Sequence, residues 1–360
     1  MSKKKPNILI IGNLHSNPSS SAFLNKFLKI IRELSSEIYV ISGDEPLNYD
    51  NIFWKGTKYD NPSKNILTNY LLFFRGQLSL FWMILNANFD YDKVIILPTS
   101  VLLSVILLKL KRKKIAIFVA QELKSFILRI IIRINFMISD LLIVESENVI
   151  NSWKIEKYKE KIINGSVYVD INLFKKNKEI YEKKDVIGYI GLLDDRKGTM
   201  ELIEAISIIN NIKKSNNLKF IIGGIGIFED YIKKFSSKND NVEFKGLIKN
   251  ENLPNIYNQL KILVLPSNSE GLPNVILEAM ACGTIVLATP VGAIPDIIQD
   301  GKNGFILQNN SPECISKNIF RVLNHNDLDL ISERATKLIK ERFDYKSAVM
   351  RYQEIINELC

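Results

Sequence analysis

The sequence is poor in the residues that bind metals or form disulfide frameworks. Its 360 residues include three cysteines and two histidines, namely Cys282, Cys314, Cys360, His15 and His325. An odd number of cysteines without metal-ligand spacing fits reduced thiols in a cytosolic setting. Two histidines are too few to build a zinc site. We therefore expect neither a disulfide scaffold nor a structural zinc centre.

Long uninterrupted apolar runs are also missing. The run Val94–Leu108 contains Pro98 and falls short of the roughly 20 residues that a membrane span needs. The stretch Phe126–Val144 is interrupted by two arginines and an aspartate, whose charges are costly in lipid. Three lysines near the start precede only the short run Ile8–Ile11, which is typical of a buried strand rather than a signal peptide. These features predict a cytoplasmic protein, with peripheral attachment to the cytoplasmic face of a membrane as an open alternative.

Positive charge is concentrated in the first half of the chain. The formal net charge is +9, and residues 1–150 hold 19 Lys and Arg against 12 Asp and Glu. Residues 151–360 are nearly balanced, with 29 basic and 27 acidic residues. A bias of this kind indicates an anionic partner such as lipid head groups, nucleic acid or a phosphorylated substrate.

Short β-branched runs alternate with helical stretches along the chain, which is typical of a parallel α/β architecture. The apolar runs are unbroken, as expected for strands covered on both faces. Amphipathic helices are expected at Ser21–Leu34, Thr68–Leu85 and Tyr345–Leu359. The expected strands form two series: Asn7–Ile11, Glu37–Ile41, Lys93–Leu97, Lys114–Val119 and Leu141–Val144, then Val186–Ile190, Lys219–Ile222, Asn241–Lys245, Ile262–Leu265, Ile285–Ala288 and Gly304–Leu307.

The two series predict two domains, because 360 residues exceed one ordinary core. The first domain is expected over residues 1–167, joined by the terminal helix at 343–360. The polar, lysine-rich stretch 168–184 is interpreted as a linker, and residues 185–342 as the second domain.

The strongest functional signal is a pair of glutamates, Glu270 and Glu278, with seven residues between them. Glu270 follows the expected strand Ile262–Leu265, so it falls in a loop at the carboxyl end of a strand. Ligands bind at that edge of open α/β sheets. One carboxylate suits the hydroxyls of a sugar and the other suits the ribose of a nucleotide.

The residues between the two glutamates predict a turn followed by a short helix. Gly271 permits a tight turn, Pro273 is favourable at the first turn of a helix, and Gly283 ends the helix. The amino end of such a helix offers unpaired N–H groups to an anion. Gly271, Leu272, Pro273 and Asn274 are therefore expected to contact the ligand.

A second motif, Gly188 to Gly198, presents cations just before another helix. The expected strand Val186–Ile190 ends at Gly191, and Arg196 and Lys197 precede a helix that begins near Thr199. A lysine in this place can neutralise a diphosphate as charge builds on the leaving group.

Together these motifs resemble the family 4 retaining glycosyltransferases of the GT-B fold, the group 1 transferases. The resemblance extends over roughly residues 162–310 and includes Val286–Gly292, Ile294–Asp296 and Asp300–Phe305. It implies an α/β fold with two Rossmann-like, doubly wound domains that face each other across a cleft. It also implies that the C-terminal helix crosses back to the N-terminal domain, which binds the acceptor, while the C-terminal domain binds the nucleotide sugar.

The resemblance assigns roles to individual residues of this sequence. Glu270 would meet the transferred sugar and Glu278 the ribose, while Lys197 matches the lysine that stabilises the departing diphosphate. The family usually carries an arginine directly after the first loop glycine, and this sequence has Leu192 there. Arg196 is an additional cation that would take its place.

No cofactor and no metal are expected. Lysine and helix dipoles would do the work of a cation at the diphosphate. An Asp-x-Asp metal motif in a suitable position is also missing, because Asp90 and Asp92 precede an expected strand rather than follow one.

Glycine-rich turns supply weaker signals. Phe220–Gly226 includes three glycines after an expected strand, which is a common pattern by itself. It resembles the glycine-rich loop of the family, and Gly246-Leu247 resembles the segment that packs on the base. Gly191, Gly224, Gly226 and Leu247 thus complete the expected donor contacts.

The polar loop Gly12–Ser21 corresponds to the family loop that shapes the acceptor site and approaches the donor phosphate. Gly12 and His15 are its candidate residues. Many family members carry a histidine near the position of Val119, where this chain has Ala120, Gln121 and Glu122. Either that contact is lost or Gln121 replaces it with a neutral hydrogen bond.

A basic and apolar face is expected in the first half. The cluster Lys109–Lys114 follows an apolar helix, and Arg129 and Arg133 share a face of the stretch Phe126–Met137. This pattern fits an anionic membrane surface or, equally, a core helix with snorkelling arginines. Nucleic-acid binding is disfavoured, because no zinc, helix-turn-helix or aromatic-basic motif accompanies the charge.

We accordingly expect a retaining glycosyltransferase that moves a hexose-type unit from a UDP- or GDP-sugar to a glycan, lipid-linked or surface-polysaccharide acceptor. A non-catalytic sugar-nucleotide-binding subunit and a GT-B epimerase are alternatives, because Leu192 replaces the arginine. An NAD-dependent oxidoreductase is a further alternative, although no Gly-x-Gly-x-x-Gly follows the first expected strand.

Overall fold

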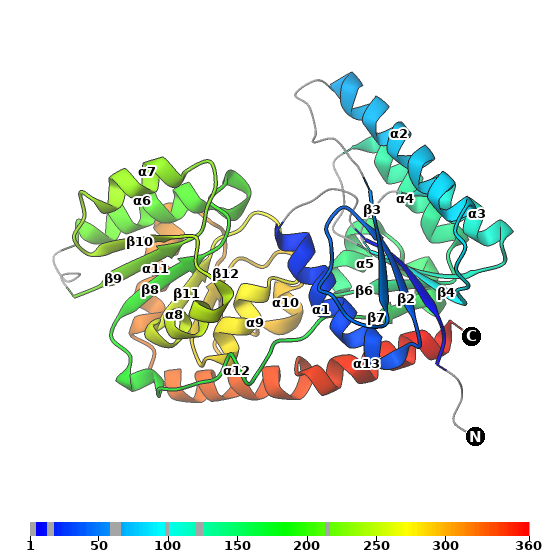
Figure 1. Ribbon diagram of the computed structural model, residues 1–360. Coiled ribbons are helices and arrows are strands. Elements are labelled where there is room, and N and C mark those ends of the chain that lie inside the picture. The colour runs from blue at the N-terminus through cyan, green and yellow to red at the C-terminus, as the bar shows by residue number, and fades with distance from the viewer. Residues whose placement is uncertain are drawn as a thin grey trace. The chain divides into compact units, whose positions relative to one another are not determined.

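The computed structural model describes residues 5–12, 18–57, 66–97, 101–119, 125–212 and 217–359. The chain forms two compact units (Figure 1). Unit 1 holds the residues up to 145, residues 149–167 and the terminal segment from 345, and unit 2 holds residues 146–148 and 168–344. Each unit has its own parallel sheet.

Unit 1 is built on a seven-stranded sheet in the order β3-β2-β1-β4-β5-β6-β7. All of its pairings are parallel, and β1, β4 and β6 are buried along their whole length. The strands are β1 (Ile8–Ile11), β2 (Ile38–Ser42), β3 (Ile52–Gly56), β4 (Lys93–Ile96), β5 (Lys114–Phe118), β6 (Leu141–Val144) and β7 (Ile162–Asn164). The helices are α1 (Pro18–Leu34), α2 (Ile66–Leu85), α3 (Leu102–Leu110), α4 (Phe126–Ile138), α5 (Glu147–Trp153) and α13 (Tyr345–Glu358).

Unit 2 is built on a six-stranded parallel sheet in the order β10-β9-β8-β11-β12-β13. Its strands are β8 (Val186–Ile190), β9 (Lys219–Gly223), β10 (Val242–Gly246), β11 (Ile262–Leu265), β12 (Ile285–Ala288) and β13 (Phe305–Ile306). Its helices are α6 (Thr199–Asn210), α7 (Glu229–Ser236), α8 (Leu253–Gln259), α9 (Asn274–Ala281), α10 (Ile294–Ile297), α11 (Pro312–Leu323) and α12 (Leu328–Arg342).

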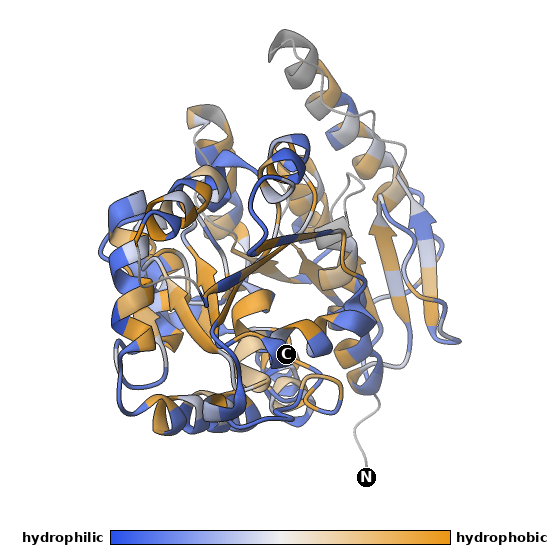
Figure 2. Ribbon diagram, turned by 90° about the vertical axis from the view of Figure 1, so that its left-hand side faces the viewer, coloured by the Kyte–Doolittle hydropathy of each residue, from blue (hydrophilic) through white to orange (hydrophobic). Residues whose placement is uncertain are grey.

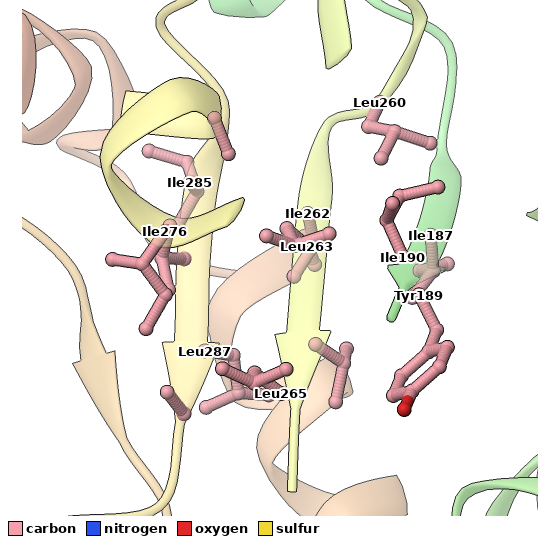
Figure 3. Close-up of a cluster of buried hydrophobic side chains, with 14 of the residues drawn as sticks. Ile187, Tyr189, Ile190, Leu260, Ile262, Leu263, Leu265, Ile276, Ile285 and Leu287 are labelled. Atoms are coloured by element: carbon pink, nitrogen blue, oxygen red, sulfur yellow. The ribbon is translucent and has the colours of Figure 1, made fainter. Parts of the chain in front are cut away.

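The core of unit 2 shows why its strands read as continuous apolar runs. Ile187 on β8, Ile262 on β11 and Leu287 on β12 are at most 1% exposed, and Ile276 of α9 belongs to the same buried cluster (Figure 3). Figure 2 shows the strands predominantly hydrophobic, whereas the helices mix both kinds of residue. Helices on both faces therefore remove these strands from water, which is the main stabilising contribution.

Both sheets have the 3-2-1-4-5-6 strand order of the Rossmann fold, with β7 added at one edge of the first. The predicted class of two doubly wound domains is therefore confirmed. The predicted return of the C-terminal helix is confirmed too, because α13 belongs to unit 1 and packs against α1. The Tyr352 ring meets Phe27 edge-on at 5.2 Å, and the Tyr345 hydroxyl donates to the Lys29 carbonyl at 2.8 Å.

The stretch 168–184 packs on unit 2 despite its polar composition. The Val169 amide donates to the Phe343 carbonyl at 2.8 Å, and the 3₁₀ turn Ile180–Glu182 buries Ile180. The Lys183 ammonium donates to the carbonyls of Tyr257 and Cys282, both at 3.3 Å. Burial lowers the pKa of Lys183 to about 8.

Two parts of unit 1 differ from expectation. The edge strands β3 and β7 were not predicted, because β3 is mostly exposed and β7 has only three residues, so neither shows an apolar run. Residues 68–85 are helical as predicted, but their interpretation as amphipathic is wrong, because α2 (Ile66–Leu85) exposes large apolar side chains on its outer face, including Phe74 and Trp82. Among the helices that the structure describes, none combines the length and the apolar character that a membrane span requires.

Candidate donor site in unit 2

The candidate site lies where the strand order of unit 2 changes direction. β8 pairs with β9 on one side and with β11 on the other, so the chain leaves the carboxyl ends of β8 and β11 toward opposite halves of the sheet. Such a switch point is where open α/β sheets bind ligands. The loop after β8 carries Lys197, and the loop after β11 carries Glu270.

The loop after β8 is held by a local cap and a left-handed turn. The Asp194 carboxylate accepts from the Lys197 amide at 3.1 Å and caps the 3₁₀ turn Asp195–Lys197. Gly198 follows with φ +66°, and a Cβ built there would lie 2.1 Å from the Pro266 carbonyl oxygen. Only glycine suits both requirements, so the loop after β8 can lie directly against the loop after β11.

Lys197 and Glu270 form a bidentate ion pair. The Lys197 Nζ lies 2.7 Å from each carboxylate oxygen of Glu270. The Glu270 side chain is only 6% exposed and that of Lys197 is 20% exposed. The buried Ser267 hydroxyl also donates to Glu270 Oε1 at 2.7 Å, so the carboxylate orientation is fixed from two sides.

Further hydrogen bonds join the two loops. The Asn268 amide donates to the Arg196 carbonyl at 2.7 Å, and the Asn268 side chain donates to the Asp195 carbonyl at 3.0 Å. Behind Glu270, the Ala293 amide donates to the Gly271 carbonyl at 2.9 Å. The ion pair is therefore supported by backbone from three strand-end loops, which favours a preorganised site.

The cation beside Lys197 is directed differently. Arg196 donates to the Asp194 carboxylate from Nη2 at 2.9 Å and from Nε at 3.3 Å, and its side chain is 69% exposed. Leu192 exposes its side chain, and its carbonyl accepts from the Tyr189 hydroxyl at 2.6 Å. Figure 3 shows Tyr189 reaching toward the carboxyl ends of the strands. The structure thus holds Arg196 at the loop surface, within reach of a ligand that binds there.

Glu278 lies on α9 and is buried. The Tyr257 hydroxyl, from the fully buried α8 side chain, donates to Glu278 Oε2 at 3.3 Å. Burial and the neighbouring carboxylate raise the pKa of Tyr257 well above its usual range, so the phenol remains a neutral donor. Tyr257 therefore orients the second glutamate as Ser267 orients the first.

Two helices begin at this edge of the sheet without a side-chain cap. The N-cap residues are Gly198 for α6 and Pro273 for α9, and neither supplies a capping oxygen. Pro273 stands just before the helix that begins at Asn274, one position earlier than its expected place in the first turn. Gly271 and Leu272 form the turn that leads into it. Uncapped helix N-termini offer N–H groups and a positive dipole end to an anion.

The glycine-rich loop after β9 packs against the loop after β8. A Cβ on Gly224 would lie 1.8 Å from the Gly191 carbonyl oxygen, and one on Gly226 would lie 2.4 Å from that of Leu193. These glycines are thus needed for loop-to-loop contact. Leu247, after β10, exposes its side chain at the same edge, as a residue that covers a ligand would.

The residues expected in the first half are only partly described. The Gly12 amide follows β1 and donates to the Ile41 carbonyl at 2.8 Å within unit 1. His15 and Gln121 lie outside the described residues. Their expected roles stay predictions.

Among the described residues, no group of three His, Cys, Asp or Glu side chains is arranged to hold a metal ion. The thiols of Cys282 and Cys314 are free.

The sequence did not reveal several residues that orient the site. Ser267, Asn268 and Asp194 stand within the two motifs. Ser267 and Asp194 lie three residues before Glu270 and Lys197, and Asn268 lies two residues before Glu270, so their short spacing is the signal that could have indicated them. Tyr257 lies on a separate helix, and no local pattern points to its contact with Glu278.

Comparison with known proteins matches the part of the chain that contains this site to a family model. Residues 170–341 match the family model described as glycosyl transferases group 1. An uncharacterized glycosyltransferase of Methanocaldococcus jannaschii is 30% identical over 190 residues, which cover 51% of this chain and 48% of that protein. The capsular polysaccharide biosynthesis glycosyltransferase CapM of Staphylococcus aureus is 31% identical over 181 residues, covering 48% and 45%. The chain spans about half the length of the curated relatives it matches.

Solved structures extend the similarity of fold to the whole chain. The crystal structure of Anabaena HepE in complex with UDP-glucose has a TM-score of 0.73 at 18% identity, covering 98% of this chain and 99% of that one. Sucrose-phosphate synthase from Thermosynechococcus elongatus has a TM-score of 0.74 at 15% identity, covering 99% of each chain. At such identities the likeness concerns the fold alone.

Fold and site together define a two-unit α/β protein of the GT-B class. Residues 170–341, which make up most of unit 2, match the model of the group 1 glycosyl transferases, and the two glycosyltransferases named above resemble the chain over about half of its length. The predicted resemblance to the group 1 transferases is thereby confirmed for this part of the chain.

Proposed function

We propose that the protein transfers a sugar from a UDP- or GDP-sugar to a glycan or lipid-linked acceptor, with retention at the anomeric carbon, as the resemblance to family 4 implies. The observation that carries this proposal is the Lys197–Glu270 pair at the switch point of unit 2, flanked by the uncapped starts of α6 and α9. A carboxylate, an ammonium and two helix amino ends are the groups that a sugar diphosphate requires.

Lys197 is proposed to stabilise the departing diphosphate. An ammonium has three N–H donors, of which two serve the Glu270 oxygens, so a third can reach a phosphate oxygen. The amides at the start of α6 and α9 would share the developing negative charge. Arg196 would add a second cation if it leaves Asp194.

Glu270 is proposed to bind hydroxyls of the transferred sugar, and Glu278 those of the ribose. Carboxylates accept two such hydrogen bonds readily. Ser267 and Tyr257 hold the two carboxylates in place, so they would fix the sugar relative to the nucleotide. Gly191, Gly224, Gly226 and Leu247 would line the nucleotide through backbone and apolar contacts.

The proposed step breaks the bond between the anomeric carbon and the diphosphate oxygen. The acceptor oxygen forms the new bond on the same face, and its proton passes to the departing phosphate. Glu270 acts in this route by orienting the sugar, and no metal or covalent enzyme intermediate takes part.

The comparisons support this proposal in two ways. Structures of Anabaena HepE hold UDP, glucose or UDP-glucose, and CapM is named for capsular polysaccharide biosynthesis. A lipid-linked acceptor would be presented at a membrane, so we also propose a peripheral location on its cytoplasmic face. The family match favours a glycosyltransferase over an NAD-dependent oxidoreductase.

Leu192 favours a second candidate function without sugar transfer, which is either a sugar-nucleotide-binding subunit or a GT-B epimerase. Its exposed side chain stands where the family usually has an arginine. An assay with UDP- and GDP-sugars and a lipid-phosphate acceptor separates the candidates, with the anomeric configuration read by NMR. Transfer with retention is expected for the wild type, and loss of transfer for Glu270→Gln. Donor binding or epimerisation without transfer would support the second candidate. A rise in melting temperature with NAD, but with neither UDP nor GDP, would reject both candidates.

A further inference from the structure

Helix α2 exposes an apolar stripe instead of a polar one. Its outward residues recur at helical spacing and are strongly exposed: Leu71 (64%), Phe74 (56%), Leu78 (52%), Trp82 (59%) and Leu85 (41%). The opposite side, with Leu80 and Ile84, is buried in the core. A helix that is apolar all round is typical of a buried or membrane-contacting position, whereas a surface helix of a globular protein normally turns a polar face outward.

Two neighbouring helices also expose apolar side chains. α3 packs against both α2 and α4 in unit 1 (Figure 1). The outward apolar side chains of these two helices are Ile106 and Leu110 on α3, and Phe126, Ile130 and Met137 on α4. Single exposed apolar residues are ordinary, but ten on three adjacent helices are typical of an interaction surface. We call these ten residues the α2–α4 surface.

The charge around the α2–α4 surface is of one sign. Residues 66–85, 101–114 and 125–139 contain no Asp or Glu and eight Lys or Arg. Lys109 pairs with Asp140 at 2.8 Å, and Lys113 lies 3.8 Å from Asp90. The exposed cations of these segments are Arg75, Arg112, Lys114 and Arg133. An apolar face with a basic rim is complementary to anionic lipid.

We propose that the α2–α4 surface docks on an anionic lipid bilayer, with α2 lying along the interface. A second copy of the chain is a poorer occupant, because two faces with the same basic rim and no acid in these helices would repel each other. α2 has 20 residues but does not qualify as a membrane span, so it lies on the bilayer rather than across it. Docking would bring the chain to a lipid-linked acceptor, and this role rests on the proposed function. Binding of the α2–α4 surface to lipid does not itself require catalysis.

Vesicle binding by the full-length chain tests the proposal. In a sedimentation assay, vesicles of phosphatidylglycerol and phosphatidylcholine are expected to bind the protein at least about tenfold more strongly than vesicles of pure phosphatidylcholine. This binding should weaken as the salt concentration rises. Leu78→Gln should weaken binding by about tenfold or more, because a leucine side chain that enters the bilayer contributes strongly to the affinity for the membrane. Leu330→Gln is the matched control, since Leu330 is 43% exposed on α12 of unit 2 and should leave binding unchanged.

Tryptophan fluorescence gives a second readout. Trp82 is expected to be quenched by brominated lipid chains. Trp82→Phe should remove most of that quenching, because Trp153 is buried and Trp54 lies on β3, which is not part of the α2–α4 surface. Equal binding to neutral and anionic vesicles, or no loss in Leu78→Gln, would overturn the proposal. So would a concentration-dependent dimer that Leu78→Gln dissociates. Binding of soluble UDP or GDP by Leu78→Gln should match the wild type, so a failed docking test and a failed proposed function are distinguishable.

Discussion

The Lys197–Glu270 pair is predicted to have separable contributions to stability and to turnover. Lys197→Met leaves the Glu270 carboxylate, which is 6% exposed, with its hydrogen bond from Ser267 but without the ammonium. Glu270→Gln leaves the Lys197 ammonium, which is 20% exposed, without the carboxylate. Removing one partner of a buried pair costs about 3–5 kcal/mol. Lys197→Met should lower the free energy of unfolding by about 3 kcal/mol. Glu270→Gln should lower it by only about 1–2 kcal/mol, because the remaining Lys197 ammonium can turn toward water.

The double variant separates the two effects. It leaves no uncompensated charge, so its free energy of unfolding should lie within about 1 kcal/mol of that of Glu270→Gln, a coupling of roughly 2–3 kcal/mol. Turnover should behave differently, because each group is proposed to contact the donor. Each single variant should lose about 10²–10³-fold in kcat, and the double variant should recover none of it.

Urea denaturation followed by far-ultraviolet circular dichroism measures the stability of both units. The three tryptophans, Trp54, Trp82 and Trp153, all belong to unit 1, so their fluorescence is an internal control that the substitutions should not shift. Additive stability losses would refute the assignment of a buried pair. Near-normal transfer by Glu270→Gln, or recovery of transfer in the double variant, would refute the catalytic assignment.

Three further predictions follow from contacts in unit 2. Tyr257→Phe removes the hydroxyl that donates to the buried Glu278, so it should lower the free energy of unfolding by about 1.5–3 kcal/mol. It should also weaken the binding of UDP or GDP in a calorimetric titration, and unchanged binding would contradict the role of Glu278. Gly198→Ala forces a Cβ to within 2.1 Å of the Pro266 carbonyl at φ +66°, so urea unfolding should show a loss of at least about 1–3 kcal/mol, and a neutral substitution would contradict the close approach of the two loops. Burial lowers the pKa of Lys183 from 10.5 to about 8, so between these pH values the folded state binds fewer protons than the unfolded state. The free energy of unfolding of the wild type, relative to that of Lys183→Met, should therefore rise by roughly 2–4 kcal/mol from pH 8 to pH 10.5. If this difference in unfolding free energy does not change with pH, Lys183 is not desolvated.

The sequence predicted the elements whose patterns are local. The fully buried strands, such as β8 and β11, appear as unbroken apolar runs, and the two motifs that follow them carry Lys197 and Glu270. Their meeting is a consequence of topology, because parallel neighbours at a switch point bring their following loops together. For this reason the pair could be anticipated without any knowledge of side-chain packing.

What the sequence did not predict depends on contacts between distant segments. Tyr257 reaches Glu278 from another helix, and Lys183 is buried by residues about 75 to 100 positions away. The outer face of α2 was misjudged for a related reason. Its residues are apolar on both sides, so periodicity alone cannot tell which side the core takes or that the other side stays exposed.

The central claim is that Lys197, Glu270 and the starts of α6 and α9 form the site of a nucleoside-diphosphate sugar. A crystal structure with bound UDP or GDP tests it most directly. The account predicts a phosphate oxygen within about 3 Å of Lys197 Nζ and of amides at the start of α6 or α9, with the ribose at Glu278. A nucleotide bound elsewhere, with Lys197 and Glu270 making no contact to it, would contradict the account.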